Sequence, residues 1–196
     1  MKLTVFYDYI CPFCYLTSKS LDQLSLEFDL EMEWKGIEIH PEFTSAGIKS
    51  PRSVKSLRIA EVIKEAASEN ETEIVLPGFR TNSRLSLEAS EFAKTRSLFK
   101  EFHDLIYDAY YLERKNIGDM DVILEAGLNA GLDAGELEEC LANRTMFDRI
   151  EENKRDAEAN MVVGVPTILF GAFPLYGNQS RETLRHVIRR AIERSA

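Results

Sequence analysis

The sequence is poor in the residues that metal sites and disulfide frameworks require. Only three cysteines and three histidines occur among its 196 residues. Cys140, His40, His103 and His186 are each isolated, whereas a structural zinc site draws its ligands from closely spaced pairs. We therefore expect no metal and no resident cofactor. A cysteine without a neighbour in the sequence also favours a reducing compartment over a disulfide framework.

Basic residues are outnumbered, with 24 Lys and Arg against 33 Asp and Glu and a net charge of −9. A surface of this charge disfavours nucleic acid and anionic membranes as partners. No apolar run approaches the length that spans a bilayer. The ten residues before Cys11 have the pattern of a strand and leave no room for a secretory signal, so we expect a cytoplasmic protein.

The sequence does contain a Cys11-Pro12-Phe13-Cys14 motif between a predicted strand and a predicted helix. Residues 1–7 are rich in β-branched and aromatic side chains, which is typical of a short buried strand. Pro12 suits the first position of a helix, because its φ is already helical and its missing N–H costs no hydrogen bond. The motif is therefore predicted to open the first helix.

A thiol at the start of a helix is predicted to be reactive. Unpaired N–H groups and the positive end of the helix dipole stabilise an anion there, and the thiolate is the reactive form of cysteine. Cys14 lies one turn further on, on the same apolar face as Leu21, Leu24 and Phe28. We predict an exposed nucleophile at Cys11 and a sheltered resolving thiol at Cys14. Zinc would need two further ligands, and a structural disulfide closing so short a loop would add little stability.

The remaining chain changes its periodicity twice. Residues 31–35 alternate as a strand, and the alternation slips at Gly36, which predicts a bulge. From about Pro51 to Asn160 the pattern is helical and contains no repeat. Strands are predicted again at 167–170 and 173–176, and Ser180 is placed to cap a final helix.

This order of elements, β-α-β, then helices, then β-β-α, predicts an α/β fold in which a large all-helical insertion interrupts one sheet domain. We assign residues 1–48 and 161–196 to a discontinuous sheet domain. Residues 49–160 are assigned to a helical insertion domain.

Short segments spread over the whole chain carry a family resemblance: 8–15, 37–41, 82–83, 108–111, 164–167 and 177–179. With these motifs in this order, the chain resembles the thioredoxin superfamily and, within it, a DsbA-family protein of the FrnE-like cytosolic branch. The resemblance implies a thioredoxin-like fold with a helical insertion. Relatives often have a histidine where Leu87 stands, so no polar role is carried over to that position.

The resemblance also implies the composition of the site. A cis peptide bond between Val165 and Pro166 is expected beside the cysteine pair, and it would leave backbone groups free to pair with an extended substrate. Cys11 and Cys14 are expected to be the catalytic pair. The expected substrate-binding residues are Pro12, Phe13, Val165 and Pro166.

Four other residues are weaker candidates. Tyr9 and Tyr15 would either line an apolar substrate groove or belong to the core. Glu38 would either accept a proton from Cys14 or simply be solvated. Cys140 shares an apolar helix face and is expected to behave as a small core hydrophobe, and no role is assigned to the histidines.

We predict a thiol–disulfide oxidoreductase that reduces, isomerises or forms disulfides in protein or small-molecule thiols, glutathione included. A reducing pool favours reduction or isomerisation over net oxidation. One alternative is a glutathione-dependent isomerase or transferase of the kappa-class or 2-hydroxychromene-2-carboxylate isomerase type, although these relatives typically have serine where Cys11 stands. Another is a non-catalytic, chaperone-like binding module, which the helical insertion suggests. No oligomeric state is predicted.

Overall fold

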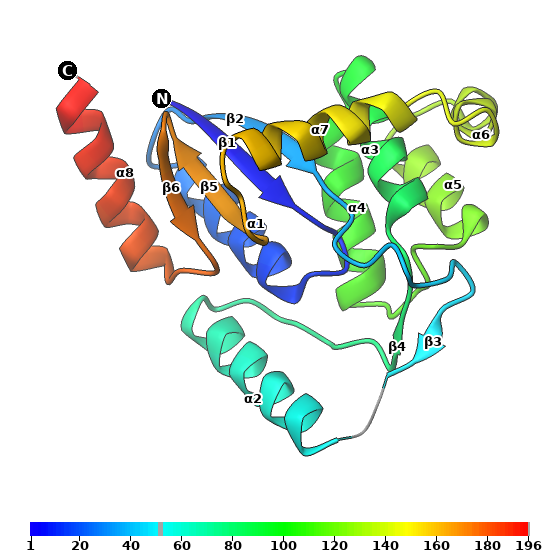
Figure 1. Ribbon diagram of the computed structural model, residues 1–196, viewed down its shortest axis with the longest axis horizontal. Coiled ribbons are helices and arrows are strands. Elements are labelled where there is room, and N and C mark those ends of the chain that lie inside the picture. The colour runs from blue at the N-terminus through cyan, green and yellow to red at the C-terminus, as the bar shows by residue number, and fades with distance from the viewer. Residues whose placement is uncertain (51–52, 196) are drawn as a thin grey trace.

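A four-stranded sheet forms the centre of the computed structural model, which describes residues 1–50 and 53–195. Its strands are β1 (Lys2–Tyr7), β2 (Glu31–Gly36), β5 (Thr167–Phe170) and β6 (Phe173–Tyr176), in the order β2-β1-β5-β6 (Figure 1). Parallel β1 and β2 are joined through α1 (Pro12–Ser25), and the antiparallel hairpin β5–β6 pairs with the other edge of β1. The predicted β-α-β and β-β-α halves therefore meet in one sheet.

Six helices lie between β2 and β5, and one follows β6, within the described ranges. They are α2 (Val54–Glu69), α3 (Arg84–Thr95), α4 (Phe99–Tyr111), α5 (Met120–Asn129), α6 (Ala134–Ala142), α7 (Phe147–Ala159) and α8 (Arg181–Ser195). The predicted fold class, α/β with a helical insertion, is confirmed. Pro51, where the helical pattern was expected to begin, lies outside the described residues.

The prediction that the middle of the chain is entirely helical is wrong in one place. β3 (Ile48–Lys49) and β4 (Phe79–Arg80) form a short antiparallel ladder on either side of α2. A two-residue strand has no measurable alternation, so periodicity could not reveal a pairing between segments about thirty residues apart. The ladder ties together the two ends of the segment that carries α2 (Figure 1).

Each face of the central sheet buries a different set of β1 side chains. Leu3, Val5 and Tyr7 belong to the large core that also contains the buried face of α1. Phe6 points to the opposite face, where it packs with Ala157 of α7 and Leu169 of β5. Figure 1 shows α7 crossing the sheet on one side and α1 lying on the other. The sheet is thus a middle layer covered by helices, as its apolar strands require.

Gly36 ends β2, and the bulge predicted there is absent from the ladder. The register between β1 and β2 runs one-to-one from Lys2 and Glu31 to Tyr7 and Gly36. The glycine instead allows a close approach, because a Cβ atom at this position would lie 2.6 Å from Cδ2 of Leu87. Leu87 is fully buried, so the position where relatives often carry histidine serves apolar packing here.

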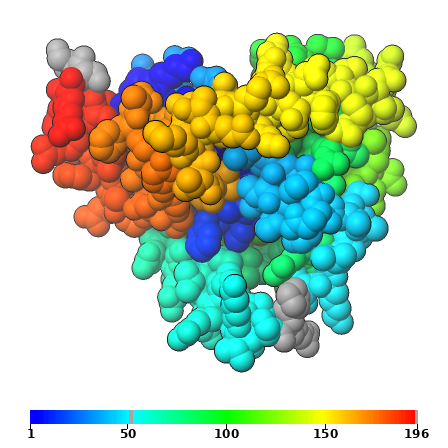
Figure 2. Space-filling view, in the orientation of Figure 1, coloured from blue at the N-terminus to red at the C-terminus, as the bar shows by residue number. Residues whose placement is uncertain are grey.

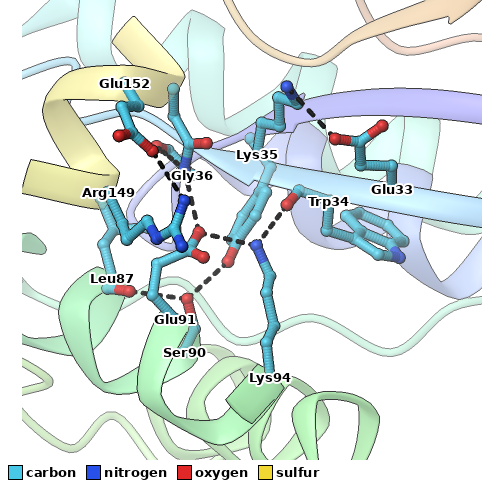
Figure 3. A network of polar contacts seen from close by, with 12 residues as sticks. Glu33, Trp34, Lys35, Gly36, Leu87, Ser90, Glu91, Lys94, Arg149 and Glu152 are labelled. Carbon is cyan, nitrogen blue, oxygen red and sulfur yellow. Dashed lines mark hydrogen bonds and ion pairs between the residues drawn. The ribbon is translucent and has the colours of Figure 1, made fainter. Parts of the chain in front are cut away.

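A polar network covers the outer edge of β2, which is an edge strand of the sheet. Edge carbonyl groups need partners from outside the sheet. Lys94 of α3 donates to the Trp34 carbonyl and to the Glu91 carboxylate (Figure 3). Asn153 of α7 donates to the Gly36 carbonyl and to the same carboxylate. The network gives the Trp34 and Gly36 carbonyls hydrogen-bond partners and links α3 and α7 to the sheet.

One buried apolar cluster includes residues of β1, α1, α3, α4, α5, α6 and α8. It therefore spans both segments that the sequence pattern assigned to separate domains, and the division at 48/49 and 160/161 stays a prediction. No helix in the described part of the chain is both long and apolar enough to cross a membrane.

Candidate functional site

The cysteine motif opens α1 as its sequence predicts. Cys11 is the residue before the helix, with an extended backbone, and Pro12 occupies the first turn. The Cys11 N–H donates to the Asp8 carbonyl at 3.2 Å, and the Cys11 carbonyl accepts from the N–H of Cys14 at 3.0 Å. These bonds fix the loop before the helix and bring the two cysteine side chains to the same end of α1. Both cysteines are free thiols in this structure.

The expectation that Cys11 is exposed is wrong. Its side chain is only 7% exposed, and that of Cys14 is 1% exposed. Part of the cover comes from the loop before β5, because the Val165 carbonyl accepts a hydrogen bond from the Cys11 Sγ at 3.6 Å. In Figure 2 the dark blue N-terminal segment is visible here only as a small patch, between the orange segment above it and α2 in cyan below. A helix start is thus not an open site when another loop packs on it.

The pKa values of the two thiols are shifted in opposite directions, downward for Cys11 and upward for Cys14. The Cys14 thiol donates a hydrogen bond that lowers the pKa of Cys11, and the backbone N–H groups of Cys14 and Phe13 lower it as well. Burial and the Asp8 charge act in the other direction without reversing the shift. Burial raises the pKa of Cys14 well above its usual value, and the bond that Cys14 donates to Cys11 holds its proton in place. Of the two thiols, this geometry therefore favours Cys11 as the one that ionises first.

The fold brings Val165 and Pro166 to the cysteine pair from a distant part of the sequence. The peptide bond between them is cis. Of the other expected substrate-binding residues, Pro12 faces a groove beside the motif, whereas Phe13 is half-buried against the core. Four of the six expected site residues therefore surround Cys11, and Phe13 contributes mainly through its backbone N–H.

The groove beside the motif has a volume of about 320 Å³ and is mostly apolar. Ile10 and Pro12 form one wall, and α2 forms another through side chains that include Leu57 and Ile63. Tyr111 of α4 also lines it. The sequence signal for this wall was the surplus of apolar residues on α2, where Leu57 remains 61% exposed although its helix is amphipathic.

Asp8 is the functional candidate that sequence reasoning missed. Its carboxylate is fully buried and accepts N–H bonds from Ile39 at 2.8 Å and from Ile10 at 3.2 Å. Burial outweighs these bonds and raises the pKa of Asp8 to about 6. Its charge in turn raises the pKa of both Cys11 and Cys14. A carboxyl inside the apolar stretch before the motif was the available signal.

Glu38, the carboxylate that was considered as a proton acceptor, is neither solvated nor free. It accepts two hydrogen bonds from the Arg84 guanidinium, at 2.8 and 3.0 Å, and its side chain is 12% exposed. This pair holds the Glu38 side chain on Arg84 of α3, whereas the carboxylate that acts on the pKa of both cysteines is that of Asp8. The structure therefore favours Asp8 over Glu38 as the acid that influences the thiols.

The weaker aromatic candidates belong to the core. Tyr9 is fully buried and Tyr15 is 2% exposed, and both hydroxyls already have hydrogen-bond partners, His103 for Tyr9 and the Glu73 carbonyl for Tyr15. His103 is also fully buried, between the hydroxyls of Tyr9 and Ser18, each 3.2 Å from a ring nitrogen. Cys140 is 6% exposed and lies against the Thr145 hydroxyl, in the core as expected. Across the described residues there is no cluster of three His, Cys, Asp or Glu side chains that could hold a metal ion.

Comparisons with known proteins identify the same fold. A family model described as a DSBA-like thioredoxin domain matches residues 2–189. A probable DsbA oxidoreductase from Streptomyces coelicolor has a TM-score of 0.86 at 21% identity, over 98% of this chain and 90% of that chain. A 2-hydroxychromene-2-carboxylate isomerase gives 0.78 at 21% identity, over 100% and 98%. The cytosolic disulfide reductase DsbM from Pseudomonas aeruginosa, in a structure with GSH, gives 0.75 at 16% identity, over 98% and 100%.

Proposed function

The chain belongs to the DSBA-like thioredoxin domain family, and we propose that it is a thiol–disulfide oxidoreductase with Cys11 as nucleophile and Cys14 as resolving thiol. The observation that carries the proposal is the cysteine pair at the start of α1, where Cys14 donates a hydrogen bond to Cys11. This arrangement makes Cys11 the thiol that ionises more readily for attack, and it holds the proton on Cys14 until the second step. We also propose that the protein belongs to the FrnE-like branch of this family and that it works in the cytoplasm.

The proposed reduction proceeds in two exchanges. The Cys11 thiolate attacks one sulfur of a substrate disulfide, so that a mixed disulfide forms and the second substrate sulfur leaves as a thiolate. Cys14 then loses its proton to solvent and attacks the Cys11 sulfur, which closes the Cys11–Cys14 bond and frees the first substrate sulfur. The substrate gains two electrons and the cysteine pair loses two. A thiol reductant, glutathione or a dithiol, restores the pair.

The surroundings of Cys11 support a role for the loop before β5 in binding substrate. The Val165 carbonyl oxygen lies 3.6 Å from the Cys11 sulfur and accepts a hydrogen bond from it while Cys11 is a protonated thiol. Its backbone is therefore within reach of any group bonded to that sulfur. We propose that Val165 and Pro166 guide an extended substrate past Cys11, and that Pro12 and the groove beside it receive an apolar neighbour of the substrate disulfide.

Trapping the mixed disulfide tests this function. A Cys14→Ser protein, reduced and mixed with a disulfide-bonded peptide, should gain the mass of one peptide chain and lose it again on addition of dithiothreitol. A Cys11→Ser protein should gain nothing. Cys140→Ala supplies the matched control: added to Cys14→Ser it should leave the trapping unchanged, and alone it should turn over the peptide like the wild-type protein. Equal trapping by the Cys11→Ser protein would refute the assignment.

Glutathione chemistry is the second candidate, favoured by the likeness to 2-hydroxychromene-2-carboxylate isomerase. An enzyme of that type would use glutathione as a cofactor for isomerisation or transfer and would not need a second cysteine. Glutathione-dependent isomerisation of 2-hydroxychromene-2-carboxylate by a Cys14→Ala protein at the wild-type rate, without peptide exchange by the wild-type protein, would favour this candidate over the first.

A further inference from the structure

The Tyr111 hydroxyl is one of two neutral polar groups, among the described residues, that are buried without a hydrogen-bond partner, and it is the one that belongs to a residue lining the groove beside the motif. Eight buried side-chain atoms there have no hydrogen-bond partner. Six of them belong to charged side chains that are ion-paired. The seventh is the Ser83 hydroxyl, which lies close enough to the Asp8 carboxylate to lower its pKa. The eighth is the hydroxyl of Tyr111, whose side chain is 1% exposed.

The aromatic ring of Tyr111 is held in place by its neighbours. It stacks on Tyr15 with ring centroids 5.1 Å apart and meets Tyr110 edge-on at 4.9 Å. Tyr15 belongs to α1 and follows the second cysteine directly, and Tyr111 is the last residue of α4. The stacked rings therefore join α1 to α4 beside the cysteine motif. A ring fixed on two sides cannot turn its hydroxyl toward a better partner, and the unpaired group is thus a property of the fold.

Tyr111 also lies at the reacting end of α1. It lines the groove together with Ile10 and Pro12, which flank Cys11 in the sequence. Burial raises the pKa of Tyr111 well above its usual value, and the charge that adds most to this effect is that of Cys11. The hydroxyl therefore keeps its proton at neutral pH, and a negative charge on Cys11 favours the protonated form further.

An unpaired buried hydroxyl lowers the stability of the folded protein, because the water it bonded in the unfolded chain is not replaced. Such a group is expected where a partner arrives only with a ligand. In disulfide exchange, the attacking and leaving sulfurs share the negative charge, and a preorganised donor near the leaving sulfur stabilises that charge.

We propose that Tyr111 is a catalytic residue of the exchange reaction, and that its hydroxyl donates a hydrogen bond to the substrate sulfur displaced when Cys11 attacks. This inference rests on the proposed oxidoreductase function. In the step concerned, the bond between Cys11 and the first substrate sulfur forms while the substrate S–S bond breaks. The electron pair of that bond leaves with the second sulfur. Tyr111 keeps its proton, and the released thiolate is protonated by water.

The test compares Tyr111→Phe with Tyr7→Phe, since each removes a single buried hydroxyl. The Tyr7 hydroxyl is bonded to Ser90 at 2.9 Å, away from the groove. Fully reduced proteins are mixed with one equivalent of a disulfide, and release of the substrate thiol is followed in a single turnover. Bis(2-hydroxyethyl) disulfide supplies a basic alkyl leaving sulfur, and 2,2′-dithiodipyridine supplies a weakly basic aromatic one.

We expect Tyr111→Phe to slow attack on the alkyl disulfide by roughly 10- to 100-fold, the range for losing one hydrogen bond to a charged group. Attack on the aromatic disulfide should slow much less, because its leaving sulfur needs little stabilisation. Tyr111→Phe should unfold at the same or a higher denaturant concentration than the wild-type protein. Tyr7→Phe should show the opposite pattern, with unchanged exchange rates and a lower unfolding midpoint.

Equal slowing of both disulfides by Tyr111→Phe would overturn the inference, since a distorted site would not distinguish between leaving groups. Unchanged rates with both disulfides would overturn it as well and would leave the oxidoreductase function standing. If the wild-type protein releases no thiol in a Cys11-dependent reaction, the proposed function fails, and the role of Tyr111 fails with it.

Discussion

Replacing Asp8 by asparagine should change how the stability of the protein depends on pH. Asp8 is fully buried beside the cysteine motif, and burial raises its pKa from 3.8 to about 6 in spite of two backbone N–H donors. The folded state therefore binds a proton that the unfolded chain releases between these two pH values. Asparagine has a similar shape and cannot take up that proton.

The sign and size of the effect follow from linkage. Between about pH 4 and pH 6 the folded state holds more protons than the unfolded state, so the free energy of unfolding falls as the pH rises. A rise in pKa from 3.8 to about 6, at 1.36 kcal/mol for each pH unit, corresponds to about 3 kcal/mol. This contribution to stability is fully present below the unfolded-state pKa and is lost above pH 6.

Urea unfolding of the wild-type and Asp8→Asn proteins from pH 4 to pH 7 measures the effect. The difference between their unfolding free energies should shift in favour of the variant by most of this ~3 kcal/mol as the pH rises, since at pH 4 the unfolded-state carboxyl is already partly ionised. Any constant cost of placing an amide against two N–H groups cancels from this slope. The Cys11 thiolate should also form at lower pH in the variant, because the Asp8 charge raises the pKa of Cys11. A constant difference across this range, or an infrared carboxyl band titrating near pH 4, would refute the reasoning.

Three further changes should have clear outcomes. Cys140→Ala should leave insulin-disulfide reduction near the wild-type rate, because Cys140 is a buried core residue away from the motif, and a loss beyond about tenfold in a folded protein would make it catalytic. The pKa of Cys11, read from thiolate absorbance, should be higher in the Cys14→Ala protein than in the Cys14→Ser protein, because only serine can still donate the hydrogen bond that lowers it. Equal Cys11 pKa values in the two variants would instead assign the shift to the helix start. Gly36→Ala should lower the free energy of unfolding, measured in urea, by about 1–3 kcal/mol, because its Cβ would lie 2.6 Å from Cδ2 of Leu87. Adding Leu87→Val should restore part of this loss, and a double variant whose destabilisation equals the sum of the two single losses would contradict the contact.

The sequence was sufficient where a feature is local and periodic. The strand of residues 2–7, the helix that Pro12 opens and the terminal hairpin all follow from side-chain spacing and turn residues, and each is present. Within the helical segment, apolar residues from Leu85 to Ala109 form a long stripe that predicts a split into two helices near residues 95–97, and α3 does end at Thr95 before α4 begins at Phe99. In these segments the local preference and the packing agree, so one sequence window is enough.

The sequence was insufficient where distant segments meet. Nothing in the Cys11 motif itself reveals that the Val165 carbonyl would cover the thiol from 154 residues away. The same holds for Asp8, whose carboxylate is bonded to the Ile39 N–H and whose pKa is set by burial. The slip in alternation at Gly36 was assigned to a bulge, whereas β2 ends at this residue and Leu87 of α3 packs against it. Each of these outcomes depends on tertiary contacts.

The surroundings of Cys11 differ from the rest of the core in how polar groups are satisfied. At the edge of β2, Glu91 accepts bonds from two side chains (Figure 3), and buried His103 has a partner at each ring nitrogen. Beside Cys11, in contrast, Asp8 is buried at a cost in stability and the Tyr111 hydroxyl has no partner at all. Networks of the first kind hold a fold together, whereas groups of the second kind persist where catalysis or binding uses them. This contrast supports placing the chemistry at the start of α1.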